Sequence, residues 1–206
     1  MKVLLFAFEG VGGSGKTSLV AGVTQHFKDS GHEVYQTREP GGSPLSEILR
    51  GRILKNPDMD VHERKEMFLL MGADHEKTLM GLTNDCLIFS DRYRGAFVAF
   101  HVYRLGIPIE KIEAEVKEKT PGFCPEITFL LDIDPQIGLM RKMGKDDLSH
   151  FDTDLEGARR EAKGYLQLAR KYNWVVLDAL IPTKSLVETV ASHITQYISS
   201  TSRAPA

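Results

Sequence analysis

Five short apolar runs divide this chain, and their spacing limits the folds that it can adopt. Most of the runs are continuously apolar rather than alternating, which is typical of strands buried on both faces. They cover residues 3–8, 33–37, 86–90, 127–133 and 174–179. Segments with helical periodicity lie between them, at 17–31, 44–54, 63–82, 108–119 and 155–172. Strands that alternate with helices predict an α/β fold, with a five-stranded parallel sheet and helices on both faces.

The size and composition of the chain narrow its organisation and its partners. Its 206 residues suit one domain, which we expect at 1–198, followed by a frayed tail at 199–206. The formal net charge of −2 gives no basic field of the kind that attracts nucleic acid or an anionic membrane. Two cysteines, Cys86 and Cys124, are too few for a disulfide framework, which favours reduced, buried thiols in a cytoplasmic protein.

The segment GVGGSGKT, Gly10 to Thr17, follows the first apolar run and opens the first helical segment. Strand, glycine-rich loop and helix form the context of a phosphate-binding loop, in which backbone N–H groups and the helix dipole surround a phosphate. Lys16 should reach the outer phosphates of a bound nucleotide, and Thr17 should bind Mg²⁺. Asp91, at the end of the run 86–90, is the expected second Mg²⁺ ligand. The predicted phosphate-binding loop residues are Gly10, Val11, Gly12, Gly13, Ser14, Gly15, Lys16, Thr17 and Ser18.

Two arginines follow predicted strands and indicate a second phosphate. Arg38 lies in TREPGGS at 37–43 and Arg92 in DRY at 91–93. Loops at the carboxyl ends of parallel strands bind ligands in such folds, and arginine binds phosphate oxygens through two parallel hydrogen bonds. We therefore predict that Arg38 and Arg92 converge on an acceptor phosphate facing the loop.

Three function classes fit a phosphate-binding loop: a small-molecule or nucleotide kinase, a GTPase switch and a non-catalytic nucleotide-binding regulator. A GTPase should carry a guanine-reading NKxD string, and the nearest string, TNDC at 83–86, does not match it. A regulator would not need arginines placed for a second phosphate. The residues thus favour a kinase, with a kinase for another small acceptor and a regulator as alternatives.

Four strings in this order, FEGVGGSGKTS, TREPGGSPLSEILR, DRY and GYLQLA, resemble the bacterial type of thymidylate kinase from about Val3 to Leu180. The resemblance implies a P-loop kinase fold, ATP with Mg²⁺ as donor, dTMP as acceptor and a homodimer. It implies that Glu9, Pro40 and the two arginines lie at the acceptor site, with Arg92 and Lys16 catalytic. It also implies that Arg141 lies beside the adenine and that 142–152 form a lid over ATP.

The chain departs from the family pattern at the loop and in the lid. The family usually has an acidic residue near the acceptor sugar where Gly12 stands. It usually has lid arginines where Met143, Lys145 and His150 stand. Lys145 supplies positive charge there, and His150 does so only when it is protonated. Both are candidate catalytic residues, with a solvated loop histidine as the alternative interpretation for His150.

The expected base pocket departs furthest. Met71 and His75 replace the family's aromatic residue and its thymine-binding arginine, while Ala96, Phe97, Phe100 and His101 replace the usual residues after DRY. These apolar residues fit either a repacked core or a changed pocket. Phe100 keeps the bulk of the family's tyrosine, which predicts a preference for deoxynucleotides. The changed pocket predicts weaker discrimination between bases, with dUMP and dGMP accepted besides dTMP.

Overall fold

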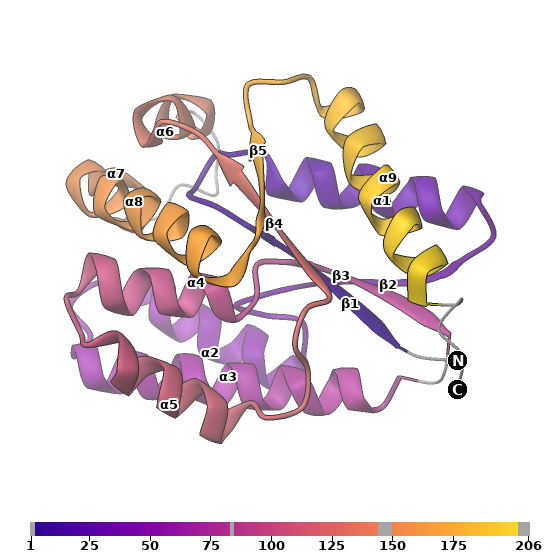
Figure 1. Ribbon diagram of the computed structural model, residues 1–206. Helices are drawn as coiled ribbons and strands as arrows, with labels where there is room; N and C mark the ends of the chain where they lie inside the picture. Colours follow the sequence, from indigo (N-terminus) through magenta and orange to yellow (C-terminus); the bar gives the residue numbers. More distant parts are fainter. Residues whose placement is uncertain (1–2, 83–84, 144–149, 202–206) are drawn as a thin grey trace.

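The computed structural model describes residues 3–82, 85–143 and 150–201 and contains a five-stranded sheet in the order β2-β3-β1-β4-β5 (Figure 1). All neighbouring strands pair in parallel, which confirms the predicted α/β class. The strands are β1 (Leu4–Glu9), β2 (Glu33–Arg38), β3 (Cys86–Asp91), β4 (Ile127–Asp132) and β5 (Val175–Asp178).

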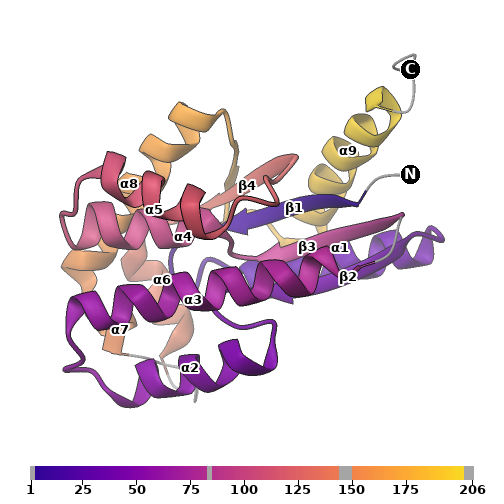
Figure 2. The same cartoon turned by 90° about the horizontal axis from the view of Figure 1, so that it is seen from below.

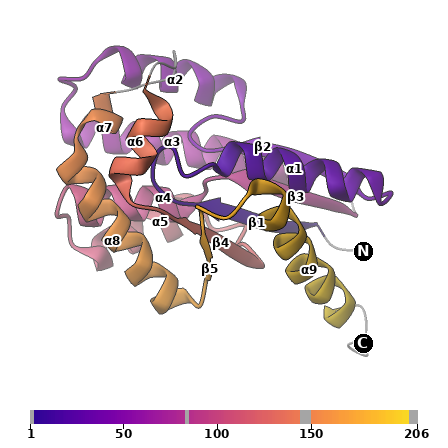
Figure 3. The same cartoon turned by 90° about the horizontal axis from the view of Figure 1, so that it is seen from above.

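Helices cover both faces of the sheet, as the alternating pattern predicts. The helices are α1 (Lys16–Asp29), α2 (Pro44–Lys55), α3 (Val61–Met80), α4 (Arg94–Val98), the π-helix η1 (Ala99–Arg104), α5 (Ile109–Lys119), α6 (Pro135–Lys142), α7 (His150–Thr153), α8 (Leu155–Tyr172) and α9 (Thr183–Thr201). Seen from above, α1 and α9 lie together over one face (Figure 3). Seen from below, α2 and α3 lie on the opposite side (Figure 2).

Alternate side chains of β1 pack against the helices on the two faces of the sheet, because successive side chains of a strand point to opposite faces. Phe6 packs against Tyr197 of α9, with ring centroids 6.1 Å apart. Leu5 and Ala7 form a second buried cluster with Leu79 of α3. Both faces of β1 are therefore dry, which explains its continuously apolar sequence.

Four helical segments, α4–η1, α6, α7 and α9, were not predicted from the sequence. Helix α9 continues to Thr201, so residues 199–201, expected in the frayed tail, are helical.

The prediction that both thiols are buried is wrong for Cys124. Cys86 is buried in β3, whereas Cys124 lies exposed in the connection before β4 and accepts a long hydrogen bond from Arg94.

Because the five strands run in parallel, their carboxyl ends share one edge of the sheet. The phosphate loop after Glu9, the turn after Arg38 and the turn after Asp91 all leave from this edge. Among the described residues, no helix is long and apolar enough to cross a bilayer.

Candidate active site

The phosphate loop joins β1 to α1 and closes on its own lysine. Gly10, Gly13 and Gly15 have φ angles of 141°, 74° and 95°, which glycine adopts without strain. Lys16 donates hydrogen bonds of 2.9 Å to the carbonyl oxygens of Gly10 and Val11. A third bond, of 3.2 Å, goes to Ser14 Oγ. The amino group of Lys16 therefore lies inside the loop, where it can exchange its bonds to carbonyl oxygens for bonds to phosphate oxygens.

Burial changes the charge of two neighbouring groups at this loop. Desolvation lowers the pKa of Lys16 to about 7. Desolvation also raises the pKa of Glu9 to about 8, although the Arg92 guanidinium and the Tyr93 N–H oppose this shift. Glu9 Oε1 accepts from Tyr93 N at 2.9 Å, and its buried Oε2 has no hydrogen-bond partner among the described residues. Glu9, predicted at the acceptor site, does not line the cavity beside the loop and lies at the base of the loop, where β1 ends.

The two predicted Mg²⁺ ligands are brought together. Thr17 Oγ1, at the start of α1, donates to Asp91 Oδ2, at the end of β3, over 2.5 Å. A hydroxyl and a carboxylate beside a phosphate loop are the hard oxygen donors that Mg²⁺ takes when phosphates and water complete its shell. The described residues contain no cluster of three or more His, Cys, Asp or Glu side chains that could hold a metal alone. The site therefore fits an ion shared with a nucleotide.

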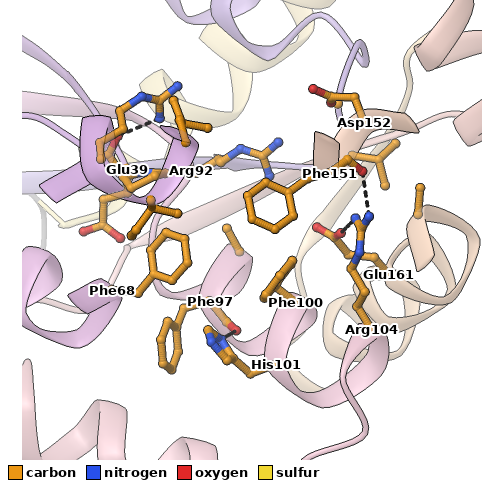
Figure 4. Close-up of a pocket in the computed structure, with 18 of the residues that line it drawn as sticks. Glu39, Phe68, Arg92, Phe97, Phe100, His101, Arg104, Phe151, Asp152 and Glu161 are labelled. Carbon is orange, nitrogen blue, oxygen red and sulfur yellow. Dashed lines mark hydrogen bonds and ion pairs between the residues drawn. The ribbon is translucent and has the colours of Figure 1, made fainter. Parts of the chain in front are cut away.

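A cavity of about 740 Å³ opens beside the loop, lined by Val11 and Gly12 (Figure 4). One part of its wall is aromatic and apolar, formed by Phe68 and Met71 of α3 with Phe97 and Phe100. Another part is charged and contains Arg50, Arg92, Arg104, Lys142, Asp152 and Glu161. A cavity that combines aromatic walls with several cationic side chains suits a nucleoside monophosphate.

Arg92 and Arg50 supply the positive charge expected for a second phosphate. Arg92 lies just after β3 with a φ of 69°, and its Nη1 donates to Tyr165 OH at 3.1 Å. Arg50 of α2 donates to the carbonyl oxygen of Pro40, which also lines the cavity. Arg38 does not line it, because its guanidinium donates twice to the Glu47 carboxylate at 2.9 Å. Of these arginines, Arg50 and Arg92 line the cavity, whereas Arg38, predicted to converge with Arg92, does not.

His75, which the sequence interpretation places in the base pocket, does not line the cavity. The ring is fully buried, and its Nδ1 donates to the Glu39 carboxylate at 2.8 Å. Its Nε2 forms a second hydrogen bond with the Thr37 hydroxyl at 2.7 Å. Thr37 lies near the end of β2 and Glu39 directly after it, so His75 holds the start of this turn in place.

The other predicted base-pocket residues do line the cavity. Met71 is buried in α3 but contributes to the wall, as do Ala96, Phe97 and Phe100. His101 also belongs to the lining and packs against Phe97, with ring centroids 4.1 Å apart, and its Nδ1 donates to the Phe97 carbonyl oxygen. Burial lowers the pKa of His101 to about 4, so this ring is neutral at physiological pH.

The predicted lid is described only at its two ends. Arg141 donates to the carbonyl oxygen of Ala179 through both terminal nitrogens at 3.2 Å. This places Arg141 beside the turn after β5. Lys145 lies outside the described residues, and so does the side chain of His150, whose backbone begins α7. At the far end, Phe151 and Asp152 line the acceptor cavity, so this part of the lid belongs to the acceptor side.

Comparison with known proteins agrees with this geometry. The family model described as thymidylate kinase matches residues 8–190. The chain belongs to the thymidylate kinase family. It is 32% identical over 200 residues to the thymidylate kinase of Bacillus cereus strain AH187, covering 92% of this chain and 96% of that protein. It is 32% identical over 204 residues to that of Bacillus mycoides strain KBAB4, covering 94% and 98%.

Membership of the thymidylate kinase family confirms the predicted P-loop kinase fold and makes the chain a phosphotransferase of the nucleoside monophosphate kinase type. The sequence interpretation missed several residues of this kinase's cavity wall. Arg50 is the last residue of the TREPGGSPLSEILR string, so its place in this string could have marked it as a site residue. No sequence pattern marks Arg104, Phe151 or Glu161 as site residues. Arg104 donates to Glu161, 57 positions away in the sequence, and a local sequence pattern cannot predict a contact over such a separation.

Proposed function

We propose that this protein transfers the γ-phosphate of ATP to dTMP, giving ADP and dTDP. One observation carries the proposal: the acceptor cavity has an aromatic end for a base, holds Arg92 and Arg50 for a phosphate, and opens at Val11 and Gly12 of the phosphate loop. An acceptor phosphate on the two arginines would face a donor phosphate on the loop.

Phosphoryl transfer requires in-line positioning, stabilisation of charge and exclusion of water, which is a competing acceptor. Arg92 and Arg50 would hold and neutralise the acceptor phosphate. Lys16 would exchange its loop carbonyls for the outer donor phosphates. Thr17 and Asp91 would hold Mg²⁺, which would neutralise part of the negative charge of the donor phosphates. Phe151 and the rest of the aromatic wall would keep water from the acceptor side.

We further propose that the enzyme discriminates between bases less than its relatives do. With His75 committed to Thr37 and Glu39, no basic side chain reaches the cavity from this position. The described base end is formed largely by Phe68, Met71, Phe97 and Phe100. Stacking on aromatic faces tolerates every base, because every base has a flat π-face. We therefore expect dUMP and dGMP as additional substrates, and Phe100 should disfavour a ribose 2′-OH.

An assay of ADP release tests these proposals with dTMP, dUMP, dGMP, dAMP, dCMP and UMP as acceptors. Turnover with dTMP is the expected result. Turnover only with another acceptor would make the chain a different small-molecule kinase, and ATP binding without transfer would make it a regulator. A kcat/KM more than about a thousandfold below that of dTMP for every other base would reject the relaxed specificity. Equal values for UMP and dUMP would remove Phe100 from sugar selection.

Two further expectations from the family belong to this proposal. A homodimer is supported by the exposed apolar side chains of α2 and α3, and the oligomeric state in solution tests it. A cytoplasmic location is supported by the need for ATP and a nucleoside monophosphate, and cell fractionation tests it.

A further inference from the structure

Gly12 differs from the other glycines of the phosphate loop. Gly10, Gly13 and Gly15 all have positive φ angles, whereas Gly12 does not. Its backbone conformation is therefore open to any L-residue. A Cβ at position 12 would instead lie 2.3 Å from Asp152 Oδ1 and 3.7 Å from Lys142 Cδ. The Asp152 carboxylate, rather than the turn, thus explains the glycine, and Lys142 lies at ordinary contact distance beside it.

Lys142 and Asp152 form an ion pair directly over the loop. Lys142 Nζ lies 2.8 Å from Asp152 Oδ2, and the two side chains are 16% and 13% exposed. Both residues line the same cavity as Gly12. The pair therefore lies where the phosphate loop meets the acceptor cavity, which is the region that a phosphoryl group must cross.

The helix that carries Lys142 is seated on the loop. A Cβ on Gly13 would lie 2.0 Å from the carbonyl oxygen of Gly138, so α6 touches the loop backbone to backbone. Lys142 is four residues after Gly138 in α6, and residues at this spacing share one helix face. The face of α6 that meets the loop thus also presents the lysine.

The segment that carries Asp152 is held from the acceptor side. The carbonyl oxygen of Phe151 accepts from Arg104 Nη2 at 2.6 Å, and the guanidinium of Arg64 lies 5.3 Å from the Phe151 ring centroid. The Phe151 ring also meets Phe100 edge-on at 5.4 Å. Figure 4 shows Phe151 between Arg92 and Phe100, with Asp152 beyond it. The residue next to Asp152 is therefore held by contacts that do not involve Lys142.

We propose that Lys142 is the lid cation that contacts the phosphoryl group during transfer, and that Asp152 is its positioning residue, in a place that only glycine at position 12 leaves open. This inference rests on the proposed function. The bond between the γ-phosphorus and the bridging oxygen breaks, and its electron pair stays on ADP. An acceptor phosphate oxygen bonds to the γ-phosphorus. Lys142 gives up no proton and stabilises the charge on the phosphoryl oxygens.

Steady-state kinetics of Lys142 variants test the role of the cation. Lys142→Ala should lower kcat about 100-fold, as loss of one preorganised donor to a transition state does, with little change in the KM of dTMP. Lys142→Arg should recover most of the rate because it keeps the charge. Lys171→Ala is the matched control, since Lys171 forms a similar pair with Glu113 on the surface. A kcat within about threefold of wild type for Lys142→Ala would overturn the proposal.

A double-mutant cycle between Gly12 and Asp152 tests the positioning. Asp152→Ala should lower kcat about tenfold and leave the KM of dTMP nearly unchanged, and Gly12→Ala should do the same by displacing the carboxylate. The double variant should be no slower than either single variant, because Asp152→Ala empties the space that the new methyl group needs. Multiplying effects would overturn the positioning role. A wild-type enzyme without dTMP turnover would reject the proposed function, whereas normal wild-type turnover with these variants unaffected would reject only this inference.

Discussion

At the scale of single residues, the phosphate loop buries Lys16, whose protonation depends on whether donor phosphates are bound. Burial lowers the pKa of Lys16 from its ordinary value of 10.5 to about 7, so at pH 8 the free protein holds it largely neutral. Donor phosphates would raise this pKa again, because an opposite charge favours the protonated form. The loop thus couples nucleotide binding to proton uptake.

ATP binding at pH 8 should therefore take up close to one proton, and at pH 6 almost none, because Lys16 is already protonated there. Calorimetric titrations in buffers of different ionisation enthalpy measure this number. The Glu9→Gln background removes the neighbouring group that also titrates near pH 8. In that background, Lys16→Ala should abolish both turnover and proton uptake. Unchanged uptake in the Lys16→Ala protein would show that another group binds the proton.

The two arginines near the turn after β2 should contribute unequally. Arg50 lines the acceptor cavity, whereas Arg38 is half exposed and held by Glu47. Arg50→Ala should lower kcat/KM for dTMP about 100-fold, comparable to Arg92→Ala, since a charge-assisted phosphate contact contributes about 3 kcal/mol. Arg38→Ala should lower it less than tenfold, with ATP affinity unchanged in all three variants. A larger loss for Arg38→Ala would show that this side chain leaves Glu47 when the acceptor binds.

At the scale of elements, η1 is positioned by its contact with α8. A Cβ on Gly164 of α8 would lie 2.2 Å from Cγ of Tyr103, so the Tyr103 side chain packs directly against the α8 backbone at this point. The same π-helix carries Phe100, His101 and Arg104, all of which line the cavity. The packing of one glycine thus fixes much of the acceptor wall.

Gly164→Ala should therefore destabilise the protein and disturb acceptor binding together. Overpacking of this kind costs about 1–3 kcal/mol, which for a chain of this size lowers the midpoint of thermal unfolding by roughly 5 °C. The KM of dTMP should rise while ATP affinity is kept. Tyr103→Ala should relieve part of the loss in the double variant. An effect of the same size from Gly51→Ala, where a Cβ meets nothing within 4 Å, would show that the contact with Tyr103 is not the cause.

The limits of sequence-based prediction also follow from these elements. The five strands and the phosphate loop were predictable, because continuous apolar runs and the Gly10–Thr17 spacing are local signals. The place of His75 was not, since its partners, Thr37 and Glu39, lie 36 to 38 positions away. The substitution at position 12 was visible in the sequence, but its reason, Asp152, appears only when α7 meets the loop.

At the scale of the whole molecule, exposed apolar side chains gather on the two helices that also wall the acceptor cavity. Among the large hydrophobic residues of the described chain that are exposed, six lie on α2 and α3: Leu45, Ile48, Leu54, Val61, Leu70 and Met80. The two helices lie side by side on one side of the molecule (Figure 2). The inner faces of the same helices present Arg50, Phe68 and Met71 to the cavity. A second copy of the chain that covers these helices would bury the apolar surface and hold the cavity wall in place.

Sedimentation velocity should accordingly find a dimer at micromolar concentration, and Ile48→Asp should convert it to a monomer. Ile48 is 71% exposed in the single chain, so the substitution does not disturb the core, but a buried, unpaired carboxylate opposes association. Leu180→Asp is the control, because Leu180 is similarly exposed but lies after β5, and this variant should remain dimeric. The monomeric variant should keep its ATP affinity and show a higher KM for dTMP, since α2 and α3 shape only the acceptor side. A wild-type monomer would exclude the dimer, and a dimer that survives Ile48→Asp would place the dimer interface on another surface. An unchanged KM in a true monomer would separate association from acceptor binding.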